Sequence, residues 1–462
     1  MPEPVGKQIE VVCLSTSGHH VVLGSAGSGK TTMAVYRAKY LTNPNLPGGG
    51  KTLIITYNKA LMRYIASVDV LAGGQVKVEN YHLFARGYLN ARGLMGGTSI
   101  IGNGARITLI EQSVQNVAAI SEENAFFQRP TKFFSDEVRW MGSHNLATLE
   151  AYIEVTRTGR AAANLSRALR PLMWKIYQRY RELRLQSGRL YDFDDIATAV
   201  SAALDLDTGN RLYRHIIIDE GQDMSPEMLR SLSKAVPADG SITFFGDMAQ
   251  QIYGRGMSWR SASLRPAKIW EFRQNYRNTV SIAQLGLAVS QMPYYAGLVD
   301  MVAPIFPVAD GPKPALVRFE TTEAELKFIV ALGKERARTR SVAILLRTYA
   351  HIAQLKQMLP DDAIAMKEDA GGWSTRPGLY FGTYHSAKGL EFEVVLLPWM
   401  ADGEIPSTAD IETDGLDEAL AQDGRLLYVG VTRAKAELVI TYTGTISPLI
   451  PPNQNLYVVS RR

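Results

Sequence analysis

Hydrophobic and polar positions follow two different rhythms along this chain. In the first 95 residues, short runs of consecutive apolar residues alternate with stretches in which apolar residues recur every three or four positions. The apolar runs are HHVVLG, KTLIITY and QVKVENY. Because runs of this kind are typical of strands buried on both faces, the alternation predicts a parallel sheet covered by helices.

The pattern of apolar and polar positions changes at about residue 96. As far as residue 190, polar and basic residues are interleaved with apolar ones at helical spacing, as in LSRALRPLMWKIYQRYREL, which predicts a helical insertion. Strand patterns return at LYRHIIIDE and SITFFGD and should complete the first sheet. A second α/β series follows, with KPALVRFE, SVAILLR, LYFGTYH, FEVVLLP and ELVITYT as its expected strands. The predicted division is 1–95 for the start of the first domain, 96–190 for the insertion, 191–278 for the rest of the first domain and 279–462 for the second.

Composition narrows the class of protein only slightly. With 462 residues and 46% hydrophobic content, the chain can build two or three packed cores. Cys13 is the only cysteine, so neither an intrachain disulfide nor a cysteine zinc site can form. The N-terminus has no basic segment followed by an apolar run, and no stretch approaches the roughly 18 apolar residues of a membrane span. We therefore expect a cytoplasmic protein without a membrane partner.

The distribution of charge is more informative than the net charge of +5. Residues 157–189 carry nine Lys or Arg and one acid, with Trp174, Tyr177 and Tyr180 among them, which permits nucleic-acid binding. Structural salt bridges are the more common use of such arginines, and core packing is the more common use of Trp174. Conversely, residues 403–424 carry seven acids and no base, a pattern typical of a solvated loop or short helix.

A phosphate-binding loop is the first motif with specific chemistry. The segment GSAGSGKT has the spacing G-x-x-x-x-G-K-[ST], follows the apolar run VVL and precedes the helical stretch TMAVYRAKYL. Such a loop presents backbone N–H groups at a helix N-terminus; Lys30 would reach the β- and γ-phosphates and Thr31 would ligate magnesium. A flexible glycine turn is the alternative, and the strand and helix on either side argue against it. The predicted nucleotide-binding residues here are Gly24, Ser25, Ala26, Gly27, Ser28, Gly29, Lys30, Thr31 and Thr32.

A second motif supplies the acids that such a site needs. In IIIDEGQD, Asp219 follows a buried-strand pattern and could hold Mg²⁺ through water, while Glu220 could act as general base. An Asp-Glu pair alone is a weak signal, but together with the loop it becomes a strong one. Further motifs follow in FFGDMAQQIYGRG, FRQNYRNT, GTYHSAKGLEFEVVLLP and RLLYVGVTRAKAEL.

Taken in order, the loop, DEGQD, GDMAQ, NYRNT, HSAKGLEF and YVGVTRAKA resemble the motifs of superfamily 1 helicases of the UvrD/Rep type. The resemblance covers nearly all of both α/β halves and matches the helical insertion only loosely. It implies an α/β fold of two RecA-like P-loop domains with parallel sheets, ATP and Mg²⁺ as cofactors, and a role such as DNA repair. It also implies nucleotide contacts by Gln8 (adenine), Tyr276 (base stacking), Glu391 (ribose), Gln250 (γ-phosphate), and Arg277 and Arg433 (arginine fingers).

Physical chemistry supports the role that the resemblance implies for Arg277 and Arg433. The phosphoryl-transfer transition state spreads negative charge over oxygens that cations can neutralise, and arginine is always charged and planar. If the arginines lie across a cleft from the loop, closure would complete the site and hydrolysis would release it, which is the cycle of a motor.

The same resemblance implies contacts with single-stranded DNA, for which a strand-tracking protein needs cations and exposed aromatic faces. Core packing is the alternative role for each aromatic residue. The spacing of Trp259 also departs from that of the family. The implied strand contacts are Tyr57, Asn58, Tyr81, His82, Tyr253, Trp259 and His385.

The acids of RLYDFDDI, Asp192, Asp194 and Asp195, could suggest a nuclease metal site. The family has the same acids without nuclease activity, so we expect helix capping and structural hydrogen bonds instead.

One departure from the family bears on mechanism. Well-known members carry a large mobile insertion ahead of HSAKGLEF, whereas only 35 residues separate Arg347 from Thr383 here. Nor does the chain have room after VITYTG for the nuclease domain of some relatives, so any nuclease would be a partner of what we expect to be a monomer.

These features leave two functions open. The first is a 3′–5′ DNA helicase that acts on single strands and on junctions with duplex. The second is a single-strand translocase or regulatory ATPase that needs a partner in a repair or defence complex. A small-molecule P-loop kinase is disfavoured because it has no use for two distant arginine motifs. RNA remains open as the track.

Overall fold

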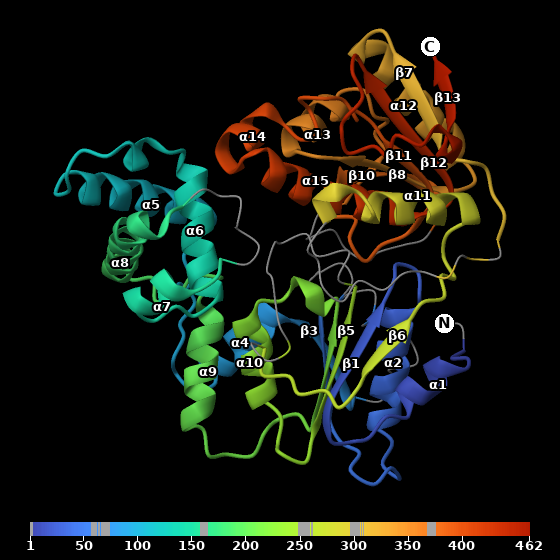
Figure 1. The fold of residues 1–462 in the computed structure, drawn as a ribbon. Helices are drawn as coiled ribbons and strands as arrows, with labels where there is room; N and C mark the ends of the chain where they lie inside the picture. Colours follow the sequence, from blue (N-terminus) through green and yellow to red (C-terminus); the bar gives the residue numbers. More distant parts are fainter. Residues whose placement is uncertain are drawn as a thin grey trace.

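The computed structural model describes residues 3–56, 62, 65, 74–157, 165–247, 259, 262–295, 305, 307, 309–366 and 376–462. Two parallel α/β domains face each other, and a helical lobe extends from the first (Figure 1). The expected fold class is therefore confirmed. No helix within the described ranges has the length and apolar character needed to cross a membrane.

The first sheet is parallel throughout, with the strand order β3-β2-β4-β5-β1-β6. Its two central strands, β4 and β5, are completely buried because helices cover both faces, which explains the continuous apolar runs in the sequence. The strands are β1 (Gly18–Gly24), β2 (Thr52–Thr56), β3 (Val76–Asn80), β4 (His215–Asp219), β5 (Ser241–Gly246) and β6 (Ile269–Phe272). The helices around it are α1 (Lys7–Val12), α2 (Lys30–Leu41), α4 (Tyr81–Asn90), α9 (Ile196–Leu206) and α10 (Pro226–Lys234).

The helical lobe has a hydrophobic core of its own. Phe133, Phe134 and Trp174 are buried in it, so Trp174 serves packing. Two basic residues of the 157–189 segment are also structural: Arg157 pairs with buried Glu137 at 2.5 Å, and Arg170 donates to three backbone carbonyls. The helices of the lobe are α5 (Asn103–Ala118), α6 (Thr131–Ser143), α7 (Leu149–Glu154) and α8 (Arg170–Gln186), with the short 3-10 helices η2 (Ala125–Gln128) and η3 (Arg167–Leu169).

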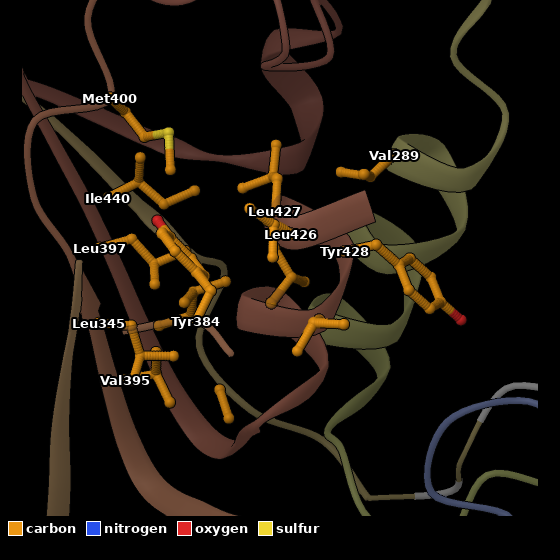
Figure 2. Close-up of a cluster of buried hydrophobic side chains, with 14 of the residues drawn as sticks. Val289, Leu345, Tyr384, Val395, Leu397, Met400, Leu426, Leu427, Tyr428 and Ile440 are labelled. Carbon is orange, nitrogen blue, oxygen red and sulfur yellow. The ribbon is translucent and has the colours of Figure 1, made fainter. Parts of the chain in front are cut away.

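The second sheet is also parallel, with the order β13-β7-β12-β11-β8-β10-β9. One of its cores lies between the sheet and α15, where Tyr384 and Leu397 pack with Leu426 (Figure 2). The strands are β7 (Ala315–Phe319), β8 (Ser341–Leu346), β9 (Ile364–Ala365), β10 (Gly378–Thr383), β11 (Phe392–Leu397), β12 (Ala434–Thr443) and β13 (Val458–Arg461). The helices are α11 (Val280–Ser290), α12 (Thr322–Ala337), α13 (Tyr349–Lys356), α14 (Thr408–Asp414) and α15 (Leu416–Thr432).

The acidic segment 403–424 is not simply solvated, which corrects the sequence interpretation. Arg347, at the end of β8, donates to Asp423 at 2.7 Å and to Asp410 at 3.2 Å. Lys132 of α6 lies 3.5 Å from Asp410, so the segment also contacts the helical lobe. Two of its acids therefore hold the second domain together.

The loop that contains RLYDFDDI is fixed by buried ion pairs. Asp192 accepts from Arg106 at 2.8 Å and from the Tyr180 hydroxyl at 2.6 Å, and Asp195 pairs with Arg184 at 2.5 Å. These contacts agree with a structural role. The expected capping is wrong for Asp195, since its side chain caps no N–H of α9 and instead accepts from the backbone of Asp192.

Candidate nucleotide-binding active site

The phosphate-binding loop joins β1 to α2 at the carboxyl edge of the first sheet. Gly27 and Gly29 have φ angles of 75° and 84°, a region that favours glycine. A Cβ on Gly27 would lie 2.4 Å from Oδ1 of Asn275, so a side chain there would also clash. The hydroxyl of Ser28 is buried and has no hydrogen-bond partner in the described structure. The loop thus has the close backbone approach that phosphate binding requires.

Lys30 is folded back onto this loop. Its Nζ donates to the carbonyls of Gly24 and Ser25, both at 2.8 Å, and lies 3.8 Å from Oδ2 of Asp247. Burial lowers the pKa of Lys30, and the negative charges of Asp247 and Glu220 oppose that shift. Lys30 is thus a buried cation whose partners a phosphate could replace.

Asp247 was not among the predicted site residues. The sequence feature that could have identified it is its position directly after the apolar run of β5, because the carboxyl ends of parallel strands meet at one edge of a sheet. It therefore lies at the same edge as the phosphate-binding loop.

Thr31 and Asp219 form a pair that fits a magnesium ion. The Thr31 hydroxyl donates to Oδ2 of Asp219 at 2.8 Å, while Oδ1 of Asp219 is buried and has no hydrogen-bond partner among the described residues. Burial and the charge of Glu220 raise the pKa of Asp219 to about 7, so a cation would stabilise its ionised form. No group of three His, Cys, Asp or Glu in the described ranges is placed to hold a metal, so phosphate and water oxygens would complete this coordination.

Glu220 has the properties of an ionised base. Its φ of 53° places a non-glycine residue in the left-handed region, a strain that often accompanies functional residues. Burial raises its pKa, but the positive charges of Lys388, Lys30 and Arg433 outweigh burial and lower the pKa overall. Gln222 donates to its carboxylate at 2.5 Å and orients it.

The second domain contributes Arg433 from the C-terminal end of α15. This side chain is buried, and its guanidinium donates to the carbonyls of Val429 and Leu390, each at 3.1 Å. Burial and the charge of Arg277 lower its pKa to about 10, while Glu220 raises it. The charges of Arg433 and Glu220 influence each other's pKa, so the two side chains lie near each other across the two domains.

Arg277 and Glu391 bind each other. Nε of Arg277 lies 3.0 Å from Oε2 of Glu391, and Nζ of Lys435 lies 3.3 Å from the same oxygen. The charge of Arg277 is the main reason that the pKa of Glu391 is lowered to about 2. Glu391 is not among the residues that line the cavity beside the loop, so its contact with a ribose stays a prediction.

A cavity of about 670 Å³ adjoins the phosphate-binding loop. Gln8, Ser28, Phe272 and Tyr276 line it. Gln8 donates to the Ser28 carbonyl at 3.4 Å, and the Tyr276 N–H donates to the Gly27 carbonyl at 3.0 Å, so both residues are tied to the loop. The volume of the cavity lies in the range of small-molecule sites, and Tyr276 is 60% exposed, which leaves it accessible for stacking.

Two contacts between the domains were not predicted from the sequence. Nζ of Lys388 lies 2.6 Å from Oδ1 of Asp223, and both side chains are buried. Tyr428 directs its ring away from the other labelled side chains of its cluster (Figure 2), and its hydroxyl bonds the backbone of Ala26 in the phosphate-binding loop. Both residues of the second domain lie in recognised motifs, but nothing in the sequence identified their partners.

Two family models match this chain. The UvrD/REP helicase N-terminal domain matches residues 5–277, and the UvrD-like helicase C-terminal domain matches residues 367–445. The chain belongs to the UvrD/Rep helicase family. The family that the ordered sequence motifs indicated is therefore confirmed.

Individual relatives of the helicase family are distant. A DNA helicase II of Rickettsia typhi is 27% identical over 39% of this chain, and the match spans only 29% of that protein. A probable DNA helicase of Mycoplasma pneumoniae is 22% identical, over 95% of this chain and 83% of its own length. The ATP-dependent DNA helicase UvrD2 of Mycobacterium tuberculosis is 21% identical, over 94% of this chain and 78% of its own length.

The structure places the residues that the helicase family implies as contacts for single-stranded DNA in different environments. Tyr81 is fully buried, and its hydroxyl bonds Ser231 at 2.7 Å, so the prediction that its ring stacks on a base is wrong for this conformation. Trp259 is partly buried and packs edge-on against Phe244, which favours core packing. His82 is partly exposed at the start of α4. Four predicted residues lie outside the described ranges: Tyr57, Asn58, Gln250 and Tyr253.

His385 follows β10 in the second domain. Burial, with the charges of Arg347 and Lys388, lowers its pKa to about 4. At neutral pH it is therefore an uncharged imidazole, and any contact with a strand would be through hydrogen bonding or stacking rather than through charge.

Proposed function

We propose that this protein is an ATP-dependent DNA helicase that translocates 3′–5′ along single-stranded DNA and unwinds duplex. The observation that carries the proposal is the position of Arg433, a buried cation of the second domain whose charge, like that of Lys30 in the first, lowers the pKa of Glu220. A triphosphate bound to the loop would lie between these groups, so its hydrolysis would change the contact between the domains.

The proposed chemistry follows from the residues that the first domain places around the nucleotide. The loop amides and Lys30 would bind the phosphates, and Thr31 with Asp219 would hold magnesium, which supplies charge neutralisation at the phosphate oxygens when bound. Glu220, held ionised and oriented by Gln222, would take the proton of the attacking water.

Residues of both domains would stabilise the transition state. Arg433 and Arg277 would neutralise the charge that spreads over the transferring phosphoryl group, and Gln250 would sense the γ-phosphate. Glu391 now holds Arg277, so the arrival of a phosphate would compete for this arginine. Gln8 and Tyr276 would hold the adenine in the cavity beside the loop.

Polarity and unwinding rest on the family. Relatives named DNA helicase support a DNA track and action at junctions between single and double strands. We further propose that the protein acts as a cytoplasmic monomer in DNA repair and that it works with a protein partner such as a nuclease.

A second function is favoured by one observation. Only 35 residues separate Arg347 from Thr383, and the described elements of that segment are α13, the two-residue strand β9 and most of β10, which belongs to the sheet of the second domain. A protein without a large accessory insertion can translocate on single strands and still need a partner to separate duplex. This alternative is a translocase or regulatory ATPase in a repair or defence complex.

One set of assays separates these functions. ATP hydrolysis and strand release would be measured in parallel on 3′-tailed, 5′-tailed and blunt duplexes, with Glu220→Gln as the inactive control. The helicase proposal expects strand-stimulated hydrolysis and release from the 3′-tailed substrate alone. Stimulated hydrolysis without release indicates the translocase, release from the 5′-tailed substrate reverses the polarity, and hydrolysis indifferent to DNA excludes both functions.

A further inference from the structure

β13 is the strand at one end of the second sheet, and its outer edge is open. It pairs with β7 on one side, and no strand of the described ranges pairs with it on the other side. All four of its residues are exposed, including Val458 at 57% and Val459 at 51%. Figure 1 shows this strand on the side of the second domain opposite to α14. An exposed strand edge is a template for pairing with another chain.

The direction of the backbone shows which groups of β13 are available. The N–H groups of Val458 and Arg462 donate to backbone carbonyls on the β7 side, each at 2.9 Å. The peptide groups of successive residues in a strand point to opposite sides. The N–H and C=O groups of Val459 and Arg461 therefore point away from β7, and no described residue hydrogen-bonds to them.

The side chains at this edge are positive. Arg461 and Arg318 are directly paired in the register of β13 and β7, so their side chains emerge on the same face of the sheet. Both are exposed, and neither forms an ion pair with a residue that the structure describes. The guanidinium of Arg462 lies over the ring of Phe328, 4.8 Å from its centroid. Like charges at neighbouring positions of a sheet are unfavourable, so a carboxylate added beside them would be stabilised.

Charge and backbone together favour one kind of occupant. A nucleic acid would contact only the arginines and would leave the outward peptide groups of Val459 and Arg461 unpaired. A second copy of this chain would bring its own Arg461 and Arg462 to the same edge, so like charges would oppose self-pairing. A peptide strand that carries carboxylates would pair with both the backbone and the guanidinium groups.

We propose that the outer edge of β13 binds an extended acidic segment of a partner protein, which adds one strand to the second sheet. The backbone of this segment would pair with Val459 and Arg461, and its carboxylates would lie against Arg461 and Arg318. The surface includes none of the residues that form the nucleotide site. The inference therefore goes beyond the proposed ATP chemistry and does not depend on the polarity of translocation or on unwinding.

The test titrates the full chain into a short fluorescent peptide that alternates valine with glutamate, and measures anisotropy. Two control peptides carry lysine in place of glutamate, or N-methyl groups on every amide, which prevent strand pairing. The protein variants are Arg461→Glu and Val459→Pro; the N–H that this proline removes points outward and makes no bond to β7. Arg338→Glu makes the same charge change at the C-terminal end of α12, next to the start of β8, and is the matched control. Thermal unfolding and strand-stimulated ATP hydrolysis check that each variant keeps its fold and its nucleotide site.

We expect the wild type and Arg338→Glu to bind the glutamate peptide and neither control peptide. Arg461→Glu should bind it about tenfold or more weakly, because repulsion replaces attraction, and Val459→Pro about 2- to 12-fold more weakly, the range for one lost hydrogen bond. Undiminished binding by Arg461→Glu, binding of the N-methylated peptide, or no binding by the wild type would overturn the proposal.

Two further results would assign the edge of β13 to a different occupant and would also overturn the proposal. Sedimentation velocity would detect a dimer of the wild type, and a dimer that Val459→Pro abolishes would identify a second copy as the occupant. Weaker binding of single-stranded DNA by Arg461→Glu, with unchanged binding of the glutamate peptide, would assign the arginines to nucleic acid.

Discussion

Nζ of Lys388 lies 2.6 Å from Oδ1 of Asp223, and this buried pair joins the second RecA-like domain to the first. Asp223 follows Glu220 by three residues, and the charge of Lys388 is also the largest influence that lowers the pKa of Glu220. One lysine thus contributes both to domain contact and to the ionisation of the proposed base. The nucleotide site depends on the second domain even before any arginine reaches a phosphate.

Lys388→Met should lower strand-stimulated ATP hydrolysis by about tenfold or more, because it leaves Asp223 buried without its cation and removes a positive charge beside Glu220. Steady-state kinetics measures the effect. Adding Asp223→Asn should restore part of the domain contact but not the charge near Glu220, so recovery should be incomplete. Full activity of the single variant would show that the pair is dispensable.

Glu220→Gln should bind ATP with nearly normal affinity and hydrolyse it about 10²- to 10⁴-fold more slowly, since the amide cannot accept the proton of water. Equilibrium binding of a fluorescent ATP analogue and single-turnover hydrolysis separate the two effects. Lys30→Ala is the comparison, because it should lose hydrolysis through its phosphate contacts. A Glu220→Gln protein with near-normal turnover would assign the base elsewhere.

Tyr428→Phe should bind nucleotide about 2- to 12-fold more tightly. The Tyr428 hydroxyl is hydrogen-bonded to the backbone of Ala26 in the phosphate-binding loop, and a bound phosphate would compete with it for this loop. Burial raises the pKa of Tyr428 well above its usual value, so the competing group is a neutral hydroxyl. Isothermal titration with a non-hydrolysable analogue gives the affinity. Tyr384→Phe removes a buried hydroxyl inside the second domain and is the matched control; weaker binding by Tyr428→Phe would contradict the competition.

Stability should fall as the pH is lowered from about 6.5 to 4, in part because of His215. Burial, with the charge of Arg37, lowers its pKa to about 4, and both ring nitrogens are hydrogen-bonded, to Ser241 and to Gly48. The unfolded chain binds a proton near its ordinary pKa of 6.5 while the folded chain does not, so the contribution of neutral His215 is complete above that pH and is lost below it. Urea unfolding of the wild type and His215→Gln at several pH values measures it. Equal pH dependence in the two proteins would exclude this histidine as a cause.

The sequence predicted the fold where the pattern was strong. The buried strands β4 and β5 end at Asp219 and Gly246, and their continuous apolar runs identified them. Three strands were missed: β6, β9 and β13 are short, of four, two and four residues, and lie at the sheet edges, where burial does not impose an apolar run.

The sequence predicted those site residues whose role does not depend on a contact between the domains. The motifs identified Lys30, Thr31 and Asp219, because a phosphate and its metal require residues of these types in these motifs. It could not show that Lys388 binds Asp223, since that contact depends on how two domains pack. It also could not distinguish Tyr81, which is buried, from His82 beside it, which is partly exposed.

The central claim is that one nucleotide is bound from both domains, and Arg433→Ala tests it most directly. The measurement is the single-turnover rate of ATP hydrolysis at saturating single-stranded DNA, together with the ATP dissociation constant and thermal unfolding of the same sample. The account predicts a rate lower by about 10³-fold or more, the effect of removing an arginine finger, with ATP still bound and the fold retained. A rate close to that of the wild type in the folded variant would contradict it.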